Sequence, residues 1–129
     1  MTTVLVIGAT GQVGRLVVEE ALGRGLSVRA QSRDAGRARG VLPAGAEVVQ
    51  ASPASAADLR PLVEGVDAVV LTHGGDVDGR GGVSFYETVL AVLEALEAGT
   101  HVSLMTAMNT SHSAGPSRYG FVEWKRRAE

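Results

Sequence analysis

The chain has 129 residues, enough for one domain and too few for a second of ordinary size. Its 12 basic and 14 acidic residues give a net charge of −2, which offers no electrostatic case for binding nucleic acid or an anionic membrane. The absence of cysteine excludes disulfides, cysteine–zinc sites and cysteine catalysis. No apolar run approaches the roughly 20 residues that span a bilayer, and the N-terminus lacks the pattern of a secretory signal, so we expect a cytoplasmic protein.

The first half of the sequence alternates between apolar runs and helical patterns. Val4–Ile7 is a continuous apolar run that ends at a glycine, which is typical of a buried strand in a parallel sheet. The helix predicted after it has one apolar face: Val13, Leu16, Val17 and Ala21. A second strand is then predicted at Leu26–Gln31, a short helix at Ala35–Gly40 and a third strand at Glu47–Gln50.

The second half continues the same alternation. Ser55–Asp58 resembles a capping box with aspartate in place of glutamate and predicts the start of a helix, although Pro61 is tolerated best in a first turn. The remaining predicted elements are a strand at Val66–Leu71, a glycine-rich loop at Thr72–Val83, a helix at 84–98 that opens with the capping box Ser84–Glu87, a strand at His101–Met105 and an amphipathic stretch from Tyr119. Strands that alternate with helices at this spacing predict right-handed βαβ units. The fold class is therefore α/β, a doubly wound parallel sheet of strand order 3-2-1-4-5 with helices on both faces.

A glycine-rich loop joins the first predicted strand to the first predicted helix. It reads Gly8-Ala9-Thr10-Gly11-Gln12-Val13-Gly14, with the spacing G-x-x-G-x-x-G. Glycine lets a backbone turn sharply and approach a pyrophosphate, and the amino end of the following helix presents free N–H groups. Because this loop follows a strand and opens a helix, it predicts a dinucleotide site. The alternative is a tight turn that needs glycine for packing alone.

The end of the second predicted strand bears on the choice of cofactor. An acidic residue about 20 positions beyond the glycines favours NAD, whereas a nearby arginine accommodates the extra phosphate of NADP. Here Ser32 and Arg33 occupy the strand tip and Asp34 lies one step farther out. A guanidinium is well shaped for a phosphate, so the sequence favours NADP over NAD. The alternative is that Arg33 and Asp34 are ordinary solvated loop charges.

The motifs GATGQVG, SVRAQSRD and GVDAVV resemble the atypical short-chain dehydrogenase/reductase superfamily over essentially the whole chain. The NmrA-like and flavin-reductase-like NAD(P)-binding proteins are the most similar branch. The resemblance implies a single Rossmann domain over residues 1–129, short at its C-terminus. It places Arg33 at the 2′-phosphate and Thr72, His73 and Gly74 beside the adenine ribose and pyrophosphate. Ser52 stands near the adenine, where the family often has an aspartate, and would substitute for it weakly.

Two departures from the family pattern bear on activity. Phe121 stands where classical members have a tyrosine four residues before Lys125, and phenylalanine has no phenolic proton to donate. Tyr119 would approach the site only if its segment is irregular. The chain also stops where family members continue into their substrate pocket. We therefore expect a truncated gene product, a fragment, or a minimal relative whose pocket another subunit completes.

These features lead to two hypotheses of function. The first is an NAD(P)H-dependent oxidoreductase that transfers hydride to a small carbonyl, quinone or flavin acceptor. In it Thr106 lies near the acceptor and Lys125 holds a ribose hydroxyl. The second is a non-catalytic NADP-binding redox sensor or regulatory module.

The expected partners are a small-molecule substrate or acceptor and further copies of the chain. The Lys125–Arg127 run is interpreted as a solvated helix face, so no nucleic-acid or membrane partner is expected, and no histidine spacing suggests a metal site. The fifth strand would be an open edge, and exposed edges tend to be covered by another chain. The resemblance also implies association through the helix at 84–98. We therefore expect a homo-oligomer, with that helix and Tyr119–Glu129 at the contact.

Overall fold

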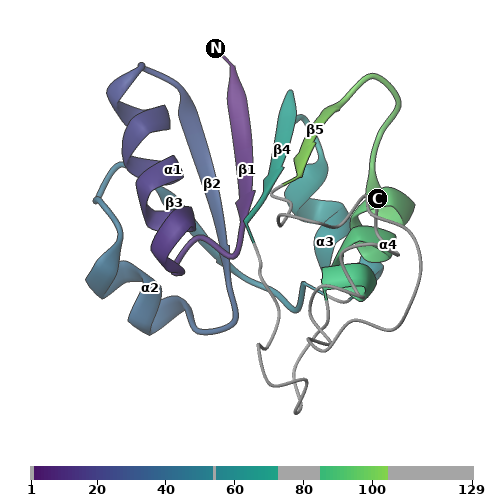
Figure 1. The fold of residues 1–129 in the computed structure, drawn as a ribbon, viewed down its shortest axis with the longest axis horizontal. Coiled ribbons are helices and arrows are strands. Elements are labelled where there is room, and N and C mark those ends of the chain that lie inside the picture. Colours follow the sequence, from purple (N-terminus) through teal and green to yellow (C-terminus); the bar gives the residue numbers. More distant parts are fainter. Residues whose placement is uncertain (1, 54, 73–84, 105–129) are drawn as a thin grey trace, which may run out of the picture.

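A computed structural model describes residues 2–53, 55–72 and 85–104, which form a layered α/β fold (Figure 1). The elements in chain order are β1 (Thr3–Ile7), α1 (Gln12–Gly23), β2 (Ser27–Ser32), α2 (Ala35–Val41), β3 (Glu47–Gln50), α3 (Ala56–Val63), β4 (Ala68–Leu71), α4 (Phe85–Ala95) and β5 (His101–Leu104). The five strands are parallel and follow the order β3-β2-β1-β4-β5, which confirms the predicted topology. None of the helices in these ranges is long and apolar enough to cross a membrane.

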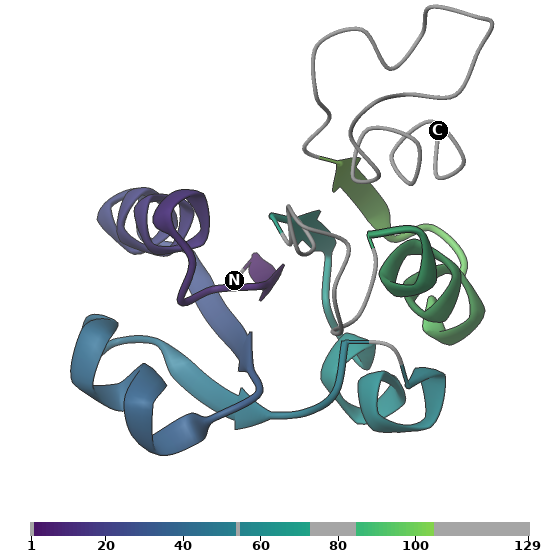
Figure 2. The ribbon, with the colours of Figure 1, turned by 60° about the horizontal axis from the view of Figure 1, so that its bottom comes forward.

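Strand β1 lies at the centre of the sheet and is buried on both sides. In its register Val4 stands opposite Val28 of β2 and Ala68 of β4. Figure 2 shows α1 and α2 on one face of the sheet and α3 and α4 on the other. Leu5 and Ile7 belong to the core cluster under α3 and α4, whereas Val4 and Val6 belong to the cluster under α1 and α2. Burial on both faces explains why the strand is a continuous apolar run instead of an alternating one.

The element boundaries depart from the predicted ones by a few residues. Strand β2 begins at Ser27 instead of Leu26, β4 begins at Ala68 instead of Val66, and α4 ends at Ala95 instead of 98. Shifts of this size are ordinary at the ends of helices and strands. The predicted loop after Thr72, the first residue of the capping box at Ser84, and the stretch from Tyr119 lie outside the described residues.

Helix α1 buries only part of the predicted face: Ala21 is buried and Val17 packs against the core, but Val13 and Leu16 do not. Its buried residues are Gly14, Val18 and Ala21, whereas Val13 is 43% exposed and Leu16 63%. The cause is the close approach of Gly14 to the loop before the helix, where an added Cβ would lie 2.1 Å from the carbonyl oxygen of Gly8. The first turn of α1 therefore packs on the loop through a glycine, which apolar periodicity does not indicate.

Helix α3 begins as its capping residues predict and contains the proline that follows them in the sequence. The Ser55 hydroxyl accepts a hydrogen bond from the Asp58 N–H at 3.2 Å, which is one half of the capping box. The Asp58 carboxylate accepts from the Ser52 N–H at 3.3 Å instead of returning to Ser55. Pro61 lies inside the helix, beyond its first turn. The missing backbone hydrogen bond is offset by burial of Leu59, Leu62 and Val63.

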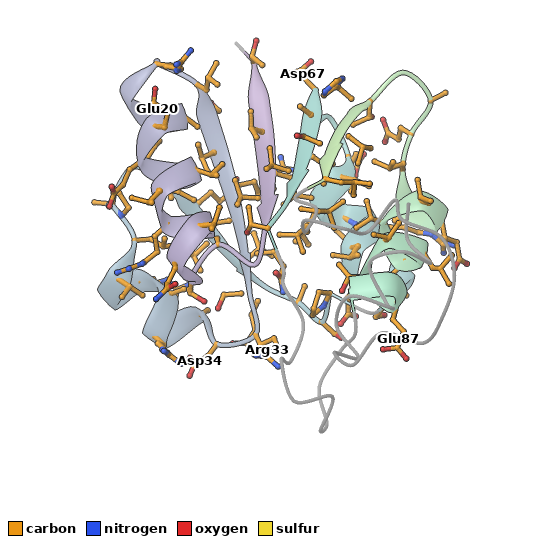
Figure 3. The ribbon with its side chains drawn as sticks, viewed as in Figure 1. Glu20, Arg33, Asp34, Asp67 and Glu87 are labelled. Atoms are coloured by element: carbon orange, nitrogen blue, oxygen red, sulfur yellow. The ribbon has the colours of Figure 1, made fainter. Side chains whose placement is uncertain are left out.

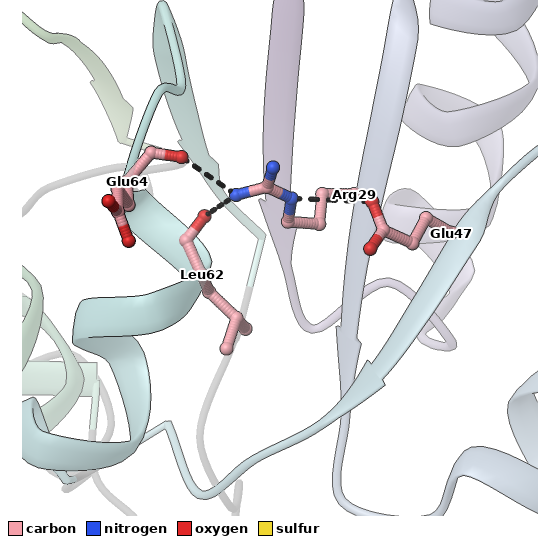
Figure 4. A network of polar contacts seen from close by, with 4 residues as sticks. All are labelled: Arg29, Glu47, Leu62 and Glu64. Atoms are coloured by element: carbon pink, nitrogen blue, oxygen red, sulfur yellow. Dashed lines mark hydrogen bonds and ion pairs between the residues drawn. The ribbon is translucent and has the colours of Figure 1, made fainter.

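An arginine on β2 ties the sheet to the end of α3 (Figure 4). Nη1 of Arg29 donates to the carbonyl oxygens of Leu62 at 2.6 Å and Glu64 at 3.0 Å. Leu62 belongs to the last turn of α3, and Glu64 is its C-cap residue. Carbonyl groups at the end of a helix have no N–H partners within the helix. The Nε atom lies 3.4 Å from Oε2 of Glu47, within ion-pair distance but without hydrogen-bond alignment. Arg29 thus links β2, β3 and α3.

Candidate functional site: the cavity at the glycine-rich loop

The glycine-rich loop leaves the carboxyl end of β1, where the winding of the sheet reverses. From β1 the chain proceeds to β2 and β3 on one side, and it then returns to β4 on the other side of β1. In open α/β sheets the crevice at such a reversal, outside the carboxyl ends of the strands, is the usual place for a ligand. The topology therefore indicates that a ligand would bind at the loop and at the neighbouring ends of β2, β3 and β4.

Hydrogen bonds and close packing fix the path of this loop. Gly8 has a φ of +77°, a backbone conformation that favours glycine, and its carbonyl oxygen accepts from the Gly11 N–H at 3.2 Å. The Thr72 hydroxyl lies 2.7 Å from the carbonyl oxygen of Ile7 and 3.1 Å from that of Gly8, so its proton is shared between them. A Cβ at Gly14 would also approach this hydroxyl to 2.9 Å. The first turn of α1, the loop and the end of β4 are packed together at this point.

The amino end of α1 opens on the loop without a side-chain cap. Gly11 is the N-cap residue, with φ −70° and ψ 172°, and among the described residues no side chain caps the helix by a hydrogen bond. The first turn also contains no acidic residue. Free N–H groups and the positive end of the helix dipole make such an end suited to an anion. A Cβ at Gly11 would meet only the Gly8 carbonyl oxygen, at 3.4 Å, so the space beside it is open.

A cavity of about 170 Å³ lies between the loop and the ends of β2, β3 and β4. It is lined by Gly8, Thr10, Gly11, Gln31, Ser32, Arg33, Pro53 and Thr72. Pockets that enclose a whole small-molecule ligand usually measure about 300–1,000 Å³. The cavity that the described residues form is therefore smaller than a pocket that encloses a whole ligand.

The two charged residues after β2 have different surroundings. Asp34 is the N-cap of α2, and its Oδ1 accepts from the Arg37 N–H at 3.1 Å. The Ser32 hydroxyl lies 3.1 Å from the Asp34 carbonyl oxygen, to which it donates, and 3.2 Å from the Asp34 N–H, from which it accepts. Arg33 is exposed and lines the cavity, and among the described residues no hydrogen bond or ion pair holds its guanidinium. Figure 3 shows Arg33 and Asp34 at the carboxyl ends of the strands, whereas Asp67 lies at their amino ends.

The structure brings part of the predicted cofactor set into this one cavity: Gly8, Thr10, Gly11, Arg33 and Thr72. Gln12, Val13 and Gly14 form the first turn of α1 behind it. The Val13 side chain faces an apolar groove of about 630 Å³ that runs along α1 to Leu26 and Val70, away from the loop.

The other predicted site residues lie beside the cavity or beyond the described ranges. Ser52 is half-buried next to the cavity-lining Pro53, and its N–H donates to Asp58. His73, Gly74, Thr106 and Lys125 lie outside the described residues, as do Tyr119 and Phe121.

Three residues that line the cavity were not predicted as cofactor contacts: Gln31, Ser32 and Pro53. Gln31 was the last residue of the predicted second strand and Ser32 lay at its tip. Gln31 is there one of the polar residues that alternate along the strand with Ser27 and Arg29, so no local signal marked its burial. Pro53 follows β3, and only the pairing of β3 beside β2 brings it to the loop. No local pattern of the sequence contains that information.

The chain is similar to known proteins both in sequence and in fold. The model of the family described as NAD(P)H-binding matches residues 8–129. A putative NAD-dependent epimerase/dehydratase from Bacillus halodurans superposes with a TM-score of 0.80 at 23% identity, over 99% of this chain and 63% of that one. The Bordetella bronchiseptica enzyme WbmH, solved in complex with NAD+, gives 0.72 at 22% identity, over 99% and 50%.

A protein from Lactobacillus casei has 28% identity and a TM-score of 0.68, over 81% of this chain and 48% of that one. The chain thus spans between 48% and 63% of the length of these three structures. A search of curated protein sequences gives no match.

Proposed function

Since the chain belongs to the NAD(P)H-binding family, we propose that it is an NADP-dependent oxidoreductase of the short-chain dehydrogenase/reductase type. The observation that carries the proposal is the uncapped amino end of α1, which opens over the glycine-rich loop into a cavity that Arg33 also lines. A helix end of this kind is suited to a pyrophosphate, and an arginine at the tip of β2 is suited to the phosphate of NADP.

The described residues fit such a cofactor. Gly14 has no room for a side chain because the loop packs on it, whereas Gly11 borders open space in which a phosphate can approach the backbone. The first-turn N–H groups of α1 would hold the pyrophosphate, and Arg33 would hold the 2′-phosphate. The nicotinamide, when bound, would donate or accept the hydride.

The contacts of Asp34 support NADP over NAD. An NAD site uses a carboxylate at the end of β2 to accept hydrogen bonds from the ribose hydroxyls. The Asp34 carboxylate already accepts from the Arg37 N–H as the cap of α2. The adjacent Arg33 has no partner among the described residues and is therefore available to an anion. Binding of the 2′-phosphate to Arg33 would leave the contact between Asp34 and the Arg37 N–H in place. Binding of the ribose hydroxyls to Asp34 would compete with that contact.

The proposed acceptor is a quinone, a flavin or a small carbonyl compound. Phe121 occupies the place of the usual proton donor, and a quinone or flavin can take its proton from solvent. Thr106 and Lys125 are proposed to stand near the acceptor and the nicotinamide ribose. The same Phe121 favours the second candidate, an NADP-binding sensor or regulatory module without turnover.

The test combines binding with turnover on the whole chain. Isothermal titration with NADPH, NADP+, NADH and NAD+ should give measurable binding, with the phosphorylated pair tighter. NADPH oxidation is then followed with a quinone, a free flavin and a small aldehyde as acceptors. Oxidation of NADPH supports the oxidoreductase, and tight binding without turnover supports the sensor. Absence of binding to all four dinucleotides overturns both.

A further inference from the structure

Gln31, the last residue but one of β2, has a buried side chain that bridges the residues after two other strands. Its side chain is 2% exposed, although glutamine is mostly found at protein surfaces. The amide Oε1 accepts from the Gly8 N–H at 2.9 Å, and Nε2 donates to the Ala51 carbonyl oxygen at 2.7 Å. The Gln31 carbonyl oxygen accepts from the Ala9 N–H at 3.3 Å. One residue of β2 thus holds the residues that follow β1 and β3.

The two partners of this amide differ in how firmly they are otherwise held. Ala51 has a second tie to β2, because its N–H donates to the Ser32 carbonyl oxygen at 3.1 Å. The Gly8 N–H has the Gln31 amide as its partner, at the residue whose positive φ begins the turn of the loop. The neighbouring Ala9 N–H keeps its bond to the Gln31 backbone carbonyl, so loss of the amide would free the loop at Gly8 itself.

An apolar residue of similar size could fill the same volume but would leave both partners unpaired. Buried N–H and carbonyl groups without partners are costly, and the cost falls when the backbone moves to find water. In this case the backbone that would move is the loop at Gly8. The Thr72 hydroxyl holds the loop from its carbonyl side, and Gln31 holds it from its N–H side.

We propose that Gln31 is a positioning residue, whose amide fixes the glycine-rich loop at Gly8 against the end of β3 and so prepares the loop for a pyrophosphate. The inference rests on the proposed function, because it assumes that the loop binds the pyrophosphate of a dinucleotide. Gln31 acts through the backbone of the loop and needs no contact with the pyrophosphate itself.

The first experiment compares two ligands that share an adenosine 2′-phosphate but differ in the pyrophosphate. In Gln31→Leu, NADP+ should bind about tenfold more weakly by calorimetry, since a buried donor and a buried acceptor lose their partners. Adenosine 2′-phosphate, which has no pyrophosphate, should keep its wild-type affinity. Gln50→Leu is the matched control, because Gln50 also bridges to a backbone N–H at this edge of the sheet, that of Ala35 at 3.2 Å. This control should leave both affinities unchanged.

The second experiment uses Gln31→Glu and the pH. A protonated carboxyl can donate to Ala51 and accept from Gly8 as the amide does, whereas an ionised one only accepts and repels the Ala51 carbonyl oxygen. Burial raises the pKa of a carboxyl, so the protonated form should be reached under mildly acidic conditions. The NADP+ affinity of Gln31→Glu, divided by that of the wild type at each pH, should recover as the pH falls.

A third readout does not depend on any ligand. Amide hydrogen exchange measured by NMR should accelerate at Gly8 in Gln31→Leu, while the amide of Val6 in the middle of β1 keeps its protection. Equal weakening of NADP+ and adenosine 2′-phosphate, or unchanged exchange at Gly8, would overturn the positioning role. A wild-type chain that binds no dinucleotide would instead contradict the proposed function, and the exchange measurement would still decide whether Gln31 holds the loop.

Discussion

Gly11 and Gly14 belong to one motif but are required for different reasons. A side chain at Gly14 would collide with the backbone of the loop, so this glycine serves the fold. Gly11 has an ordinary φ of −70°, and among the described residues an added Cβ would have one neighbour. Glycine at this position therefore keeps the space beside the backbone open. A motif analysis treats the two positions alike, and the structure separates them.

Gly11→Val should therefore remove dinucleotide binding while the protein stays folded. The added methyl groups would occupy the space that a pyrophosphate needs at the end of α1. Calorimetric titration with NADP+ measures the loss, and circular dichroism checks the fold. Gly23→Val, at the last residue of α1 where an added Cβ meets nothing within 4 Å, is the control and should bind normally. Unchanged NADP+ affinity in Gly11→Val would contradict the assignment of the site.

Arg33→Ala should weaken NADP+ far more than NAD+. A charge-assisted contact with the 2′-phosphate is worth roughly 10- to 150-fold in affinity. NAD+ lacks that phosphate and should lose little. The control is Arg39→Ala, which removes the same charge from the exposed side of α2, where it borders a separate depression beside Pro43. Equal losses for NADP+ and NAD+ in Arg33→Ala would show that this arginine does not recognise the phosphate.

At the scale of whole elements, the order and type of the strands and helices could be predicted from the sequence because each is encoded locally. Strand β1 is an unbroken apolar run, and α3 begins at the predicted capping residue Ser55, whose hydroxyl accepts from the Asp58 N–H. The burial of Gly14 and the exposure of Val13 and Leu16 could not be predicted, because the first turn of α1 packs on the loop through a glycine. The sequence predicted the residues of the glycine-rich loop that line the cavity but not the lining residues Gln31 and Pro53. Those two depend on which strands lie side by side.

The link between β2 and α3 makes a prediction of its own about stability. Arg29→Met keeps much of the side-chain volume but removes both hydrogen bonds to the carbonyl groups at the end of α3. We expect a loss of about 1–2 kcal/mol in the free energy of unfolding by urea. Arg24→Met is the control, because Arg24 forms an ion pair with Glu20 in which the two side chains are 72% and 68% exposed. Exposed pairs of this kind contribute about 0–1 kcal/mol. Equal effects of the two substitutions would mean that the Arg29 contacts add nothing to the fold.

At the scale of the whole molecule, the outward face of α4 suggests how copies of the chain would meet. The inward residues Val89, Val92 and Ala95 pack on the sheet, while Leu90 and Leu93 are 48% and 57% exposed. Residues three apart on a helix lie on one face, so these leucines form a single apolar patch. The patch lies on the side of the sheet opposite to α1 and α2 (Figure 2). Leu93 is the more exposed of the two, so it is the better residue to test.

We expect the chain to form a homodimer through this face of α4, and Leu93→Asp should convert it to a monomer. A carboxylate in the centre of an apolar contact must be desolvated without a partner, which opposes association. Light scattering at micromolar concentrations measures the mass. Leu16→Asp on α1 is the matched control, since Leu16 is 63% exposed on the other face of the sheet and should leave the dimer intact. A wild-type mass of one chain across a wide range of dilution would exclude the dimer, and a monomer produced by Leu16→Asp alone would move the contact to the groove along α1.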